Sequence, residues 1–186
     1  MEKQNLEELK QRLLALLKKE AFKKGNFVLS SGKASTYYLD GRIITLTPEG
    51  AYLVASIMLE LVKGLPVTAI GGPTLGADPI VGAIAVLSHM HSIPMKTFIV
   101  RKAAKGHGMH RQIEGPALKA GDKVIVVDDV ATSGKALLEA KEALEKIGVV
   151  IEKAIVIVDR CEGAKENLAH AGIQLDAIFS IKDLGI

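Results

Sequence analysis

Apolar residues recur along this 186-residue chain in two alternating patterns. One pattern repeats every three to four residues, as on one face of a helix, and predicts helices at residues 5–20, 48–62, 78–89, 135–147 and 161–171. The other consists of short β-branched runs typical of strands buried on both faces, at residues 67–70, 95–100, 124–127, 150–158 and 175–181. Two shorter strands are predicted at residues 27–29 and 37–39. The alternation of strands and helices predicts an α/β fold around a parallel sheet.

The size and composition of the chain indicate a single globular domain over residues 1–186, because no repeat, linker or low-complexity stretch divides it. Apolar residues make up 48% and charged residues 24% of the sequence, which is ordinary for a globular protein. Every apolar run stops short of the ~18 residues that a membrane span needs. The charged start of the chain is unlike a secretion signal. The lone cysteine, Cys161, excludes an internal disulfide, so we expect a cytoplasmic protein.

The charge and aromatic content do not favour nucleic-acid binding. The net charge is only +3, and the chain has no tryptophan and few other aromatic residues on which bases could stack. The basic residues do gather between Lys96 and Arg111. We therefore expect no nucleic-acid partner and look for a smaller anionic ligand.

The most informative stretch is residues 124–134, where branched apolar residues run into two aspartates and a small polar turn. Adjacent carboxylates are costly inside a core unless something binds them, so we expect Asp128 and Asp129 at the carboxyl edge of the sheet, where such folds bind ligands. The turn 130–134 places backbone N–H groups and hydroxyls at the start of a helix, which favours a phosphate. Carboxylates beside a phosphate cradle predict a ligand such as a ribose phosphate.

Other interpretations of the two aspartates are weaker. A Walker-type ATPase needs a glycine-rich loop that ends in Gly-Lys-Ser or Gly-Lys-Thr. Both Gly-Lys pairs, Gly32-Lys33 and Gly134-Lys135, are followed by alanine instead. Aspartates that only cap the helix and stay solvated do not account for the Thr132-Ser133-Gly134 sequence that follows them.

A second candidate is the stretch from Arg101 to Arg111, which holds four lysines and arginines and two histidines. Gly106 and Gly108 allow it to bend. Like charges this dense repel one another unless an anion collects them. Because the stretch follows a predicted strand of the same sheet, we expect it to close over an anion at the carboxyl edge; the alternative is a solvated basic loop.

Three further features are candidates for the site, and two of them have two interpretations each. The backbone amides of Gly71–Gly76 are placed either for a second anionic group or only for a tight strand-to-helix turn. Asp78 is expected to cap the helix that follows. Arg160, after the strand at 150–158, either reaches a substrate carboxylate or pairs at the surface with Asp159 or Glu162.

The remaining candidates for metal binding and nucleophilic chemistry receive little support. His89 and His91 lie near a helix end, where surface histidines are commoner than ligands. His107 and His110 have no cysteine or acidic pattern around them. Cys161 has no partner that the sequence identifies.

Together these segments resemble the type I phosphoribosyltransferases. Val124–Ala136 is similar to the motif that binds phosphoribosyl diphosphate (PRPP) across that superfamily. Phe27–Asp40 resembles the N-terminal segment of the orotate phosphoribosyltransferase family, and Arg101-Lys102…Lys105-Gly106-His107-Gly108 resembles its mobile catalytic loop. Arg160 stands where that family places the arginine for the orotate carboxylate.

The resemblance implies a central, mostly parallel sheet flanked by helices, with a small hood within residues 1–45 and the C-terminal segment. It implies transfer of ribose 5-phosphate from PRPP to orotate, giving orotidine 5'-monophosphate and diphosphate for pyrimidine biosynthesis. Mg²⁺ is the implied cofactor, held mainly by substrate and water rather than by protein ligands. A homodimer with shared active sites is implied as well, with Arg101, Lys105 and His107 acting across the interface and Lys102 in its own subunit.

The resemblance also assigns site residues. Lys105, His107, Asp128 and Asp129 are the implied catalytic residues. Thr132, Arg160 and Tyr38 are implied to bind orotate. The residues implied to bind PRPP are Arg101, Lys102, Lys105, His107, Asp128, Asp129, Val130, Ala131, Thr132, Ser133, Gly134, Lys135 and Ala136.

The chain departs from the family pattern at two positions. Many members have lysine where Ser30 stands, and many have lysine at about Gly76. Two cationic contacts to the diphosphate or nucleobase are therefore missing, for which the amides of Gly71–Gly76 are expected to substitute in part. Two alternatives remain: a purine phosphoribosyltransferase, and a PRPP-sensing regulator, for which the segment before Phe27 is too short to form a winged helix.

Overall fold

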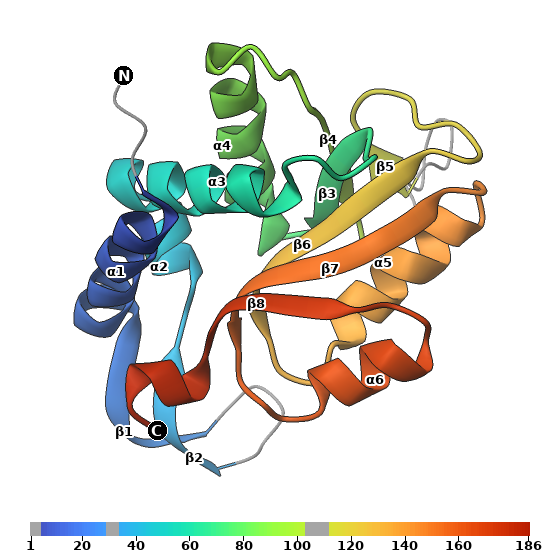
Figure 1. Ribbon diagram of the computed structural model, residues 1–186. Helices are drawn as coiled ribbons and strands as arrows, with labels where there is room; N and C mark the ends of the chain where they lie inside the picture. Colours follow the sequence, from blue (N-terminus) through green and yellow to red (C-terminus); the bar gives the residue numbers. More distant parts are fainter. Residues whose placement is uncertain (1–4, 29–33, 103–111) are drawn as a thin grey trace.

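The computed structural model describes residues 5–28, 34–102 and 112–186 of the chain. Its centre is a six-stranded sheet with the strand order β5-β4-β3-β6-β7-β8 (Figure 1). The parallel strands are β4 (Lys96–Val100), β3 (Ala69–Pro73), β6 (Lys123–Ala131), β7 (Val150–Asp159) and β8 (Leu175–Ser180). The mostly parallel sheet confirms the predicted α/β class.

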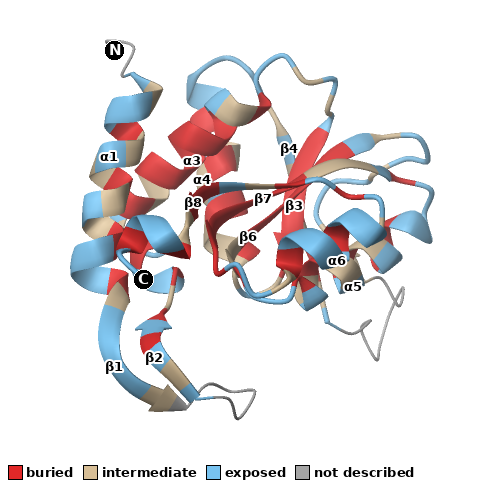
Figure 2. Ribbon diagram, turned by 60° about the horizontal axis from the view of Figure 1, so that its bottom comes forward, coloured by how far each residue is buried: buried red, intermediate tan, exposed pale blue. Residues whose placement is uncertain are grey.

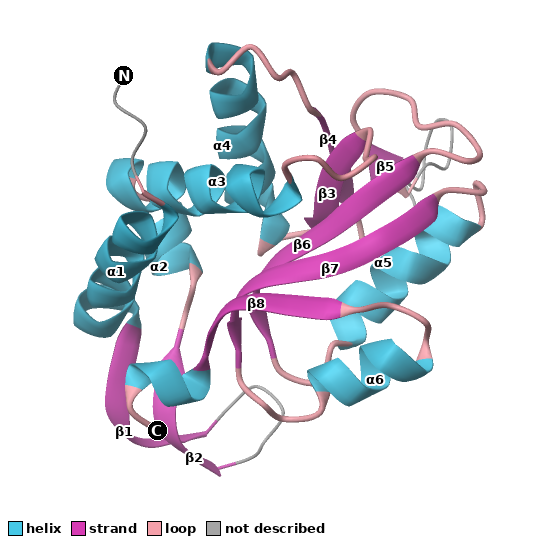
Figure 3. Cartoon of the chain, in the orientation of Figure 1, coloured by secondary structure: helices cyan, strands magenta, loops and turns pink. Residues whose placement is uncertain are grey.

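Helices cover both faces of this sheet (Figure 3). On one face α3 (Pro48–Val62) and α4 (Ala77–Met90) pack with α1 (Leu6–Leu16), and on the other lie α5 (Lys135–Glu145) and α6 (Ala164–His170). None of the helices in the described segments is long and apolar enough to cross a membrane.

Two apolar cores explain the continuous hydrophobic run of β6. Ile125 and Val127 belong to the core beneath α3 and α4, whereas Val124 and Val126 belong to the core beneath α5 and α6. Successive side chains of a strand point to opposite faces, so a strand covered on both sides needs apolar residues at every position. Figure 2 shows the resulting layer of buried residues along the sheet and α3.

The N-terminal part forms a separate hairpin beside the sheet. After α1 and a turn of π-helix (Leu17–Ala21), β1 (Phe22–Val28) pairs antiparallel with β2 (Ala34–Leu39). Both strands are longer than predicted, because the ladder continues through polar residues that carry no hydrophobic signal. The short helix α2 (Arg42–Thr45) follows and was not predicted.

The C-terminal 3₁₀ turn (Ile181–Leu184), also not predicted, lies close to the hairpin (Figure 1). The Lys24 Nζ atom of β1 donates a hydrogen bond to the carbonyl oxygen of Gly185 at 3.0 Å. The N-terminal hairpin and the C-terminal end of the chain are therefore in direct contact.

Several predicted boundaries were wrong for identifiable reasons. β6 does not stop at Val127 but runs to Ala131, since its pairing with β7 continues through Val130 and Ala131. α6 begins at Ala164 rather than residue 161, because Cys161 and Gly163 have left-handed φ values of 56° and 98°. The two-residue strand β5 (Ile113–Glu114) is too short to give a periodic pattern.

Candidate active site

The two aspartates, called here the acid pair (Asp128 and Asp129), lie near the carboxyl end of β6, as predicted. Asp128 is 8% exposed and Asp129 is half-buried. The Asp129 N–H donates to Asp128 Oδ1 at 2.9 Å, and the Val130 N–H donates to Asp129 Oδ1 at 2.8 Å. Burial raises the pKa of both carboxyls, and the neighbouring charge of Asp129 raises the pKa of Asp128 further. A ligand that donates hydrogen bonds to these carboxylates would stabilise their charged form.

The turn after β6 forms a concave site at the start of α5. A cavity of about 160 Å³ is lined by Asp128 and by residues 130–137. Gly134 adopts a left-handed φ of 76°, and Asn167 Nδ2 holds the turn by donating to the Ser133 carbonyl at 2.9 Å. The hydroxyls of Thr132 and Ser133 are on exposed residues. The structure thus brings the predicted phosphate cradle and one of the acids around a single cavity.

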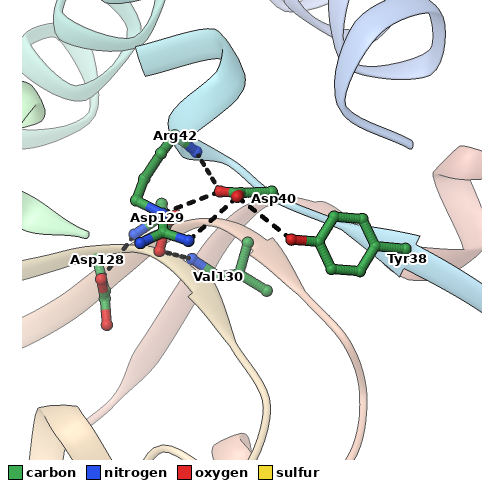
Figure 4. A network of polar contacts seen from close by, with 6 residues as sticks. All are labelled: Tyr38, Asp40, Arg42, Asp128, Asp129 and Val130. Carbon is green, nitrogen blue, oxygen red and sulfur yellow. Dashed lines mark hydrogen bonds and ion pairs between the residues drawn. The ribbon is translucent and has the colours of Figure 1, made fainter. Parts of the chain in front are cut away.

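A second network, from the hairpin side, was missed by the sequence analysis (Figure 4). Arg42 Nε and Nη2 donate to the two carboxylate oxygens of Asp40 at 3.0 and 3.1 Å, and the Arg42 backbone N–H donates to Asp40 Oδ1 at 3.1 Å. The Tyr38 hydroxyl donates to Asp40 Oδ2 at 3.4 Å. Hydrogen bonds from Arg42 lower the pKa of Asp40. The signal was a carboxylate and a guanidinium two residues apart, directly after a predicted strand.

Two glycines bring other segments against the acid pair. An added Cβ at Gly41 would lie 2.8 Å from Asp129 Cβ, so the turn before α2 touches Asp129 closely. An added Cβ at Gly76 would lie 2.0 Å from Asp128 Oδ1 and 2.6 Å from Asp129 Oδ1. A side chain at position 76 would therefore force the acid pair or the turn itself to shift.

The prediction that Asp78 caps α4 was wrong. The residue at the cap is Gly76, and Asp78 lies within the first turn of the helix. Its Oδ2 accepts a hydrogen bond from Thr74 Oγ1 at 2.9 Å. Asp78 therefore ties the helix to the β3–α4 loop (Thr74–Gly76) rather than capping its N–H groups.

Arg160 follows β7 and is buried, with 7% exposure. Its Nε donates to Glu162 Oε1 at 2.8 Å, and its guanidinium carbon lies 4.6 Å from the centroid of the Tyr37 ring. The Tyr37 hydroxyl donates to the same Glu162 oxygen at 3.3 Å. Asp159 Oδ1 instead accepts from the Cys161 N–H at 2.9 Å. The predicted ion pair with Glu162 does form, between the buried Arg160 and the exposed Glu162.

The cationic stretch is described only at its first residues. Arg101 Nη1 lies 3.2 Å from Glu114 Oε1, and the Arg101 N–H donates to the Gln112 carbonyl at 2.8 Å. Lys102 is exposed. Lys105 and His107 lie outside the described residues, so their predicted contacts stay predictions.

Sequence comparison identifies the class of protein that this fold and site define. The family described as phosphoribosyl transferase domain matches residues 47–185. The orotate phosphoribosyltransferase of Aquifex aeolicus is 47% identical over 178 residues, which cover 94% of this chain and 97% of that protein. The enzyme of the same name from Nostoc sp. is 44% identical, over 95% of this chain and 85% of that protein.

Solved structures of orotate phosphoribosyltransferases are similar to this chain as well. Mycobacterium tuberculosis H37Rv orotate phosphoribosyltransferase in complex with Fe(III) dicitrate has a TM-score of 0.84 and 35% identity, covering 96% of this chain and 99% of that one. The same enzyme in complex with PRPP has a TM-score of 0.79 and 31% identity over the same shares. The chain therefore belongs to the phosphoribosyltransferases, and within them to the orotate phosphoribosyltransferase family.

Proposed function

We propose that this protein transfers the 5-phosphoribosyl group of PRPP to orotate, releasing diphosphate and forming orotidine 5'-monophosphate for pyrimidine biosynthesis. The observation that carries the proposal is the cavity shared by Asp128 and residues 130–137. It places hydrogen-bond acceptors for sugar hydroxyls beside backbone donors for a phosphate, as a ribose 5-phosphate requires.

The cradle and the acid pair hold the sugar. The backbone N–H groups of residues 131–136 and the hydroxyls of Thr132 and Ser133 bind the 5'-phosphate. Asp128 and Asp129 accept hydrogen bonds from the 2'- and 3'-hydroxyls of the ribose. As diphosphate departs, positive charge develops on the sugar, and two nearby carboxylates stabilise it.

The cationic stretch binds the departing diphosphate. Arg101, Lys102, Lys105 and His107 neutralise its charge when the loop closes over the site. Closure also excludes water, which would otherwise hydrolyse the activated sugar. Support for this role comes from the charge density of residues 101–111 and from their position after β4, a strand of the same sheet.

Orotate is held at the far side of the sugar from the phosphate. Arg160 binds its carboxylate, while Thr132 and Tyr38 line the position of the ring. The burial of the Arg160 guanidinium supports this role, because a desolvated cation binds an anion more strongly than an exposed cation does.

Mg²⁺ fits this site as an ion carried by the substrate. Among the described residues no group of three or more His, Cys, Asp or Glu side chains is placed to hold a metal. Two adjacent carboxylates without a closed set of ligands suit an ion that keeps its waters and substrate oxygens. When bound, Mg²⁺ neutralises charge on the diphosphate.

The protein acts as a homodimer in the cytoplasm. Large apolar side chains exposed around α2 and the β3–α4 loop, and near the end of α4, support a partner surface: Ile43, Leu46, Leu75, Val86, Met90 and Ile93. The single cysteine is free, as a reducing compartment allows.

The comparisons do not favour the purine alternative. Adenine phosphoribosyltransferase from Leishmania donovani is 18% identical to this chain with a TM-score of 0.66, which shows the shared fold alone. A regulator that only senses PRPP would have no need of the buried arginine after β7.

The test follows orotate absorbance after PRPP and Mg²⁺ are added, with and without a chelator, beside parallel reactions with adenine, guanine and hypoxanthine. We expect orotate alone to be consumed, and only without the chelator. Consumption of a purine but not orotate, or binding of PRPP without any transfer, would contradict the proposal.

A further inference from the structure

Arg42 stands at the mouth of the site, yet neither the sequence motifs nor the proposed roles use it. Its guanidinium is fixed by two hydrogen bonds to Asp40, and its side chain is 45% exposed. These bonds engage Nε and one side of Nη2, whereas Nη1 donates to no residue in the described ranges. The edge of the Arg42 guanidinium that carries Nη1 is therefore held in a fixed orientation and remains available to a ligand.

Arg42 lines a cavity of about 650 Å³ between the hairpin side and the β3–α4 loop. Its lining includes Asp40, Arg42, Thr47, Leu75, Asp78 and Pro79. Arg42 is the one cation among the described residues of this lining. The opposite wall is formed by the β3–α4 loop. In one of the two interpretations of the sequence, the backbone amides of this turn bind a second anionic group.

The cavity adjoins the acid pair. Gly76, next to Leu75 in the opposite wall, leaves no room for a side chain against Asp128 and Asp129. Gly41, next to Arg42, packs as closely on Asp129. The Arg42 charge also acts on Asp129, where it opposes the effect of burial on the pKa. A sugar held by the acid pair would therefore lie next to this cavity.

We propose that Arg42 binds the diphosphate group of PRPP through the free edge of its guanidinium, while Asp40 orients it. The inference rests on the proposed function. The cation comes from Arg42, the first residue of α2, which faces the β3–α4 loop across the cavity. A guanidinium suits this task, because it binds a carboxylate with one edge and phosphate oxygens with the other.

The experiment measures dissociation constants by calorimetry for three ligands in the presence of Mg²⁺: inorganic diphosphate, PRPP and orotidine 5'-monophosphate. The nucleotide has the sugar, the 5'-phosphate and the base but lacks the diphosphate. Arg42→Gln removes the charge, and Arg42→Lys keeps it. Arg12→Gln is the matched control. Arg12 makes a comparable exposed ion pair with Glu49, with an N–O distance of 2.8 Å, and it does not line the cavity.

We expect Arg42→Gln to weaken binding of diphosphate and PRPP by about tenfold or more, the usual effect of one charge-assisted contact. Arg42→Lys should lose less, and the affinity for the nucleotide should stay unchanged in both variants. Arg12→Gln should match the parent protein for all three ligands.

Two results would overturn the inference. One is unchanged affinity of Arg42→Gln for diphosphate. The other is an equal loss for the nucleotide in both Arg42 variants, which would show that Arg42 acts through the acid pair or the fold. Because diphosphate is tested alone, a failure here differs from a failure of orotate transfer in the parent protein, which would refute the proposed function itself.

Discussion

Tyr37 and Arg160 lie 123 positions apart in the sequence, yet the guanidinium carbon of Arg160 lies 4.6 Å from the centroid of the Tyr37 ring. Both side chains also donate to the same oxygen of Glu162. Burial raises the pKa of Tyr37, so its hydroxyl keeps the proton that it donates. The arginine is thereby held between a strand of the hairpin and the residues that follow β7.

This relationship predicts that Arg160→Ala raises the KM for orotate by about 10- to 100-fold, the effect of losing charge-assisted hydrogen bonds to a carboxylate. Tyr37→Phe, which removes only the hydroxyl, should raise it by a few fold. The KM for PRPP should stay unchanged in both. Initial rates with one substrate varied at a time measure these effects, and unchanged orotate saturation in Arg160→Ala would refute the carboxylate role.

Asp128→Asn should stabilise the protein at neutral pH while removing most of its activity. The folded state raises the pKa of Asp128, so it favours the protonated acid more than the unfolded chain does. This stabilisation is complete below the ordinary aspartate pKa of about 3.9 and is lost as the pH rises through the raised value. Asparagine stays uncharged and avoids that loss.

Melting temperatures between pH 4 and pH 8 check this sign. We expect Asp128→Asn to melt higher at pH 7, by about 2–4 °C for each kcal/mol gained, with the gap closing towards pH 4. Asp176→Asn is the control. Burial raises the pKa of Asp176, but the hydrogen bonds from Lys153 and Gln174 and the nearby lysine charges together lower it, so that variant should melt lower at pH 7. A lower melting temperature for Asp128→Asn at pH 7 contradicts the account.

Gly76→Ala should damage the site although it adds only one methyl group. The new Cβ would meet Asp128 Oδ1 at 2.0 Å, so the acid pair or the β3–α4 loop must move. We expect a loss of about 1–3 kcal/mol in the free energy of unfolding and weaker PRPP binding. Denaturant titration and calorimetry measure the two quantities.

Gly82→Ala is the matched control for that substitution, because Gly82 lies within α4, the helix that follows Gly76, and its added Cβ meets no atom within 4 Å. Alanine should stabilise α4 there by up to about 1 kcal/mol. Equal behaviour of the two variants would show that the close approach at Gly76 has no consequence.

Lys105→Ala should lower turnover by about 10²-fold or more, if one loop cation supplies ~3 kcal/mol to the transition state. The measurement is kcat under saturating PRPP and orotate. Near-normal turnover would remove the cationic stretch from the mechanism.

A mixture of inactive Lys105→Ala and Asp129→Asn proteins tests the shared active sites. In a dimer whose loops reach across the interface, hybrid molecules contain one site with both residues intact, and activity should return. Subunit exchange is verified with differently tagged proteins. No recovery after proven exchange indicates sites complete within one chain.

Local patterns in the sequence were sufficient to predict the parallel sheet and the turn at residues 130–134 after its central strand. The run Val124–Val127 indicates a strand covered on both faces, and the chemistry of Asp128 through Gly134 is contiguous, so no knowledge of the fold is needed to connect it. The end of β6 could not be predicted, because its last residues are held by pairing with β7 rather than by an apolar pattern.

The parts of the site that depend on distant segments escaped prediction. Arg42 matters because the fold places it beside the acid pair. Its neighbours in the sequence do not indicate that contact. Gly76 resembles any turn glycine until the carboxylates appear against it. Tyr37 rather than Tyr38 meets Arg160, since alternation along β2 decides which ring turns inward: Tyr38 is 39% exposed and Tyr37 only 7%.

The most direct test of the central claim is a crystal structure of the protein with PRPP and Mg²⁺. We predict that the 5'-phosphate lies on the backbone amides of residues 131–136, with the ribose hydroxyls on Asp128 and Asp129. A sugar phosphate bound at any other place on the molecule would contradict the account.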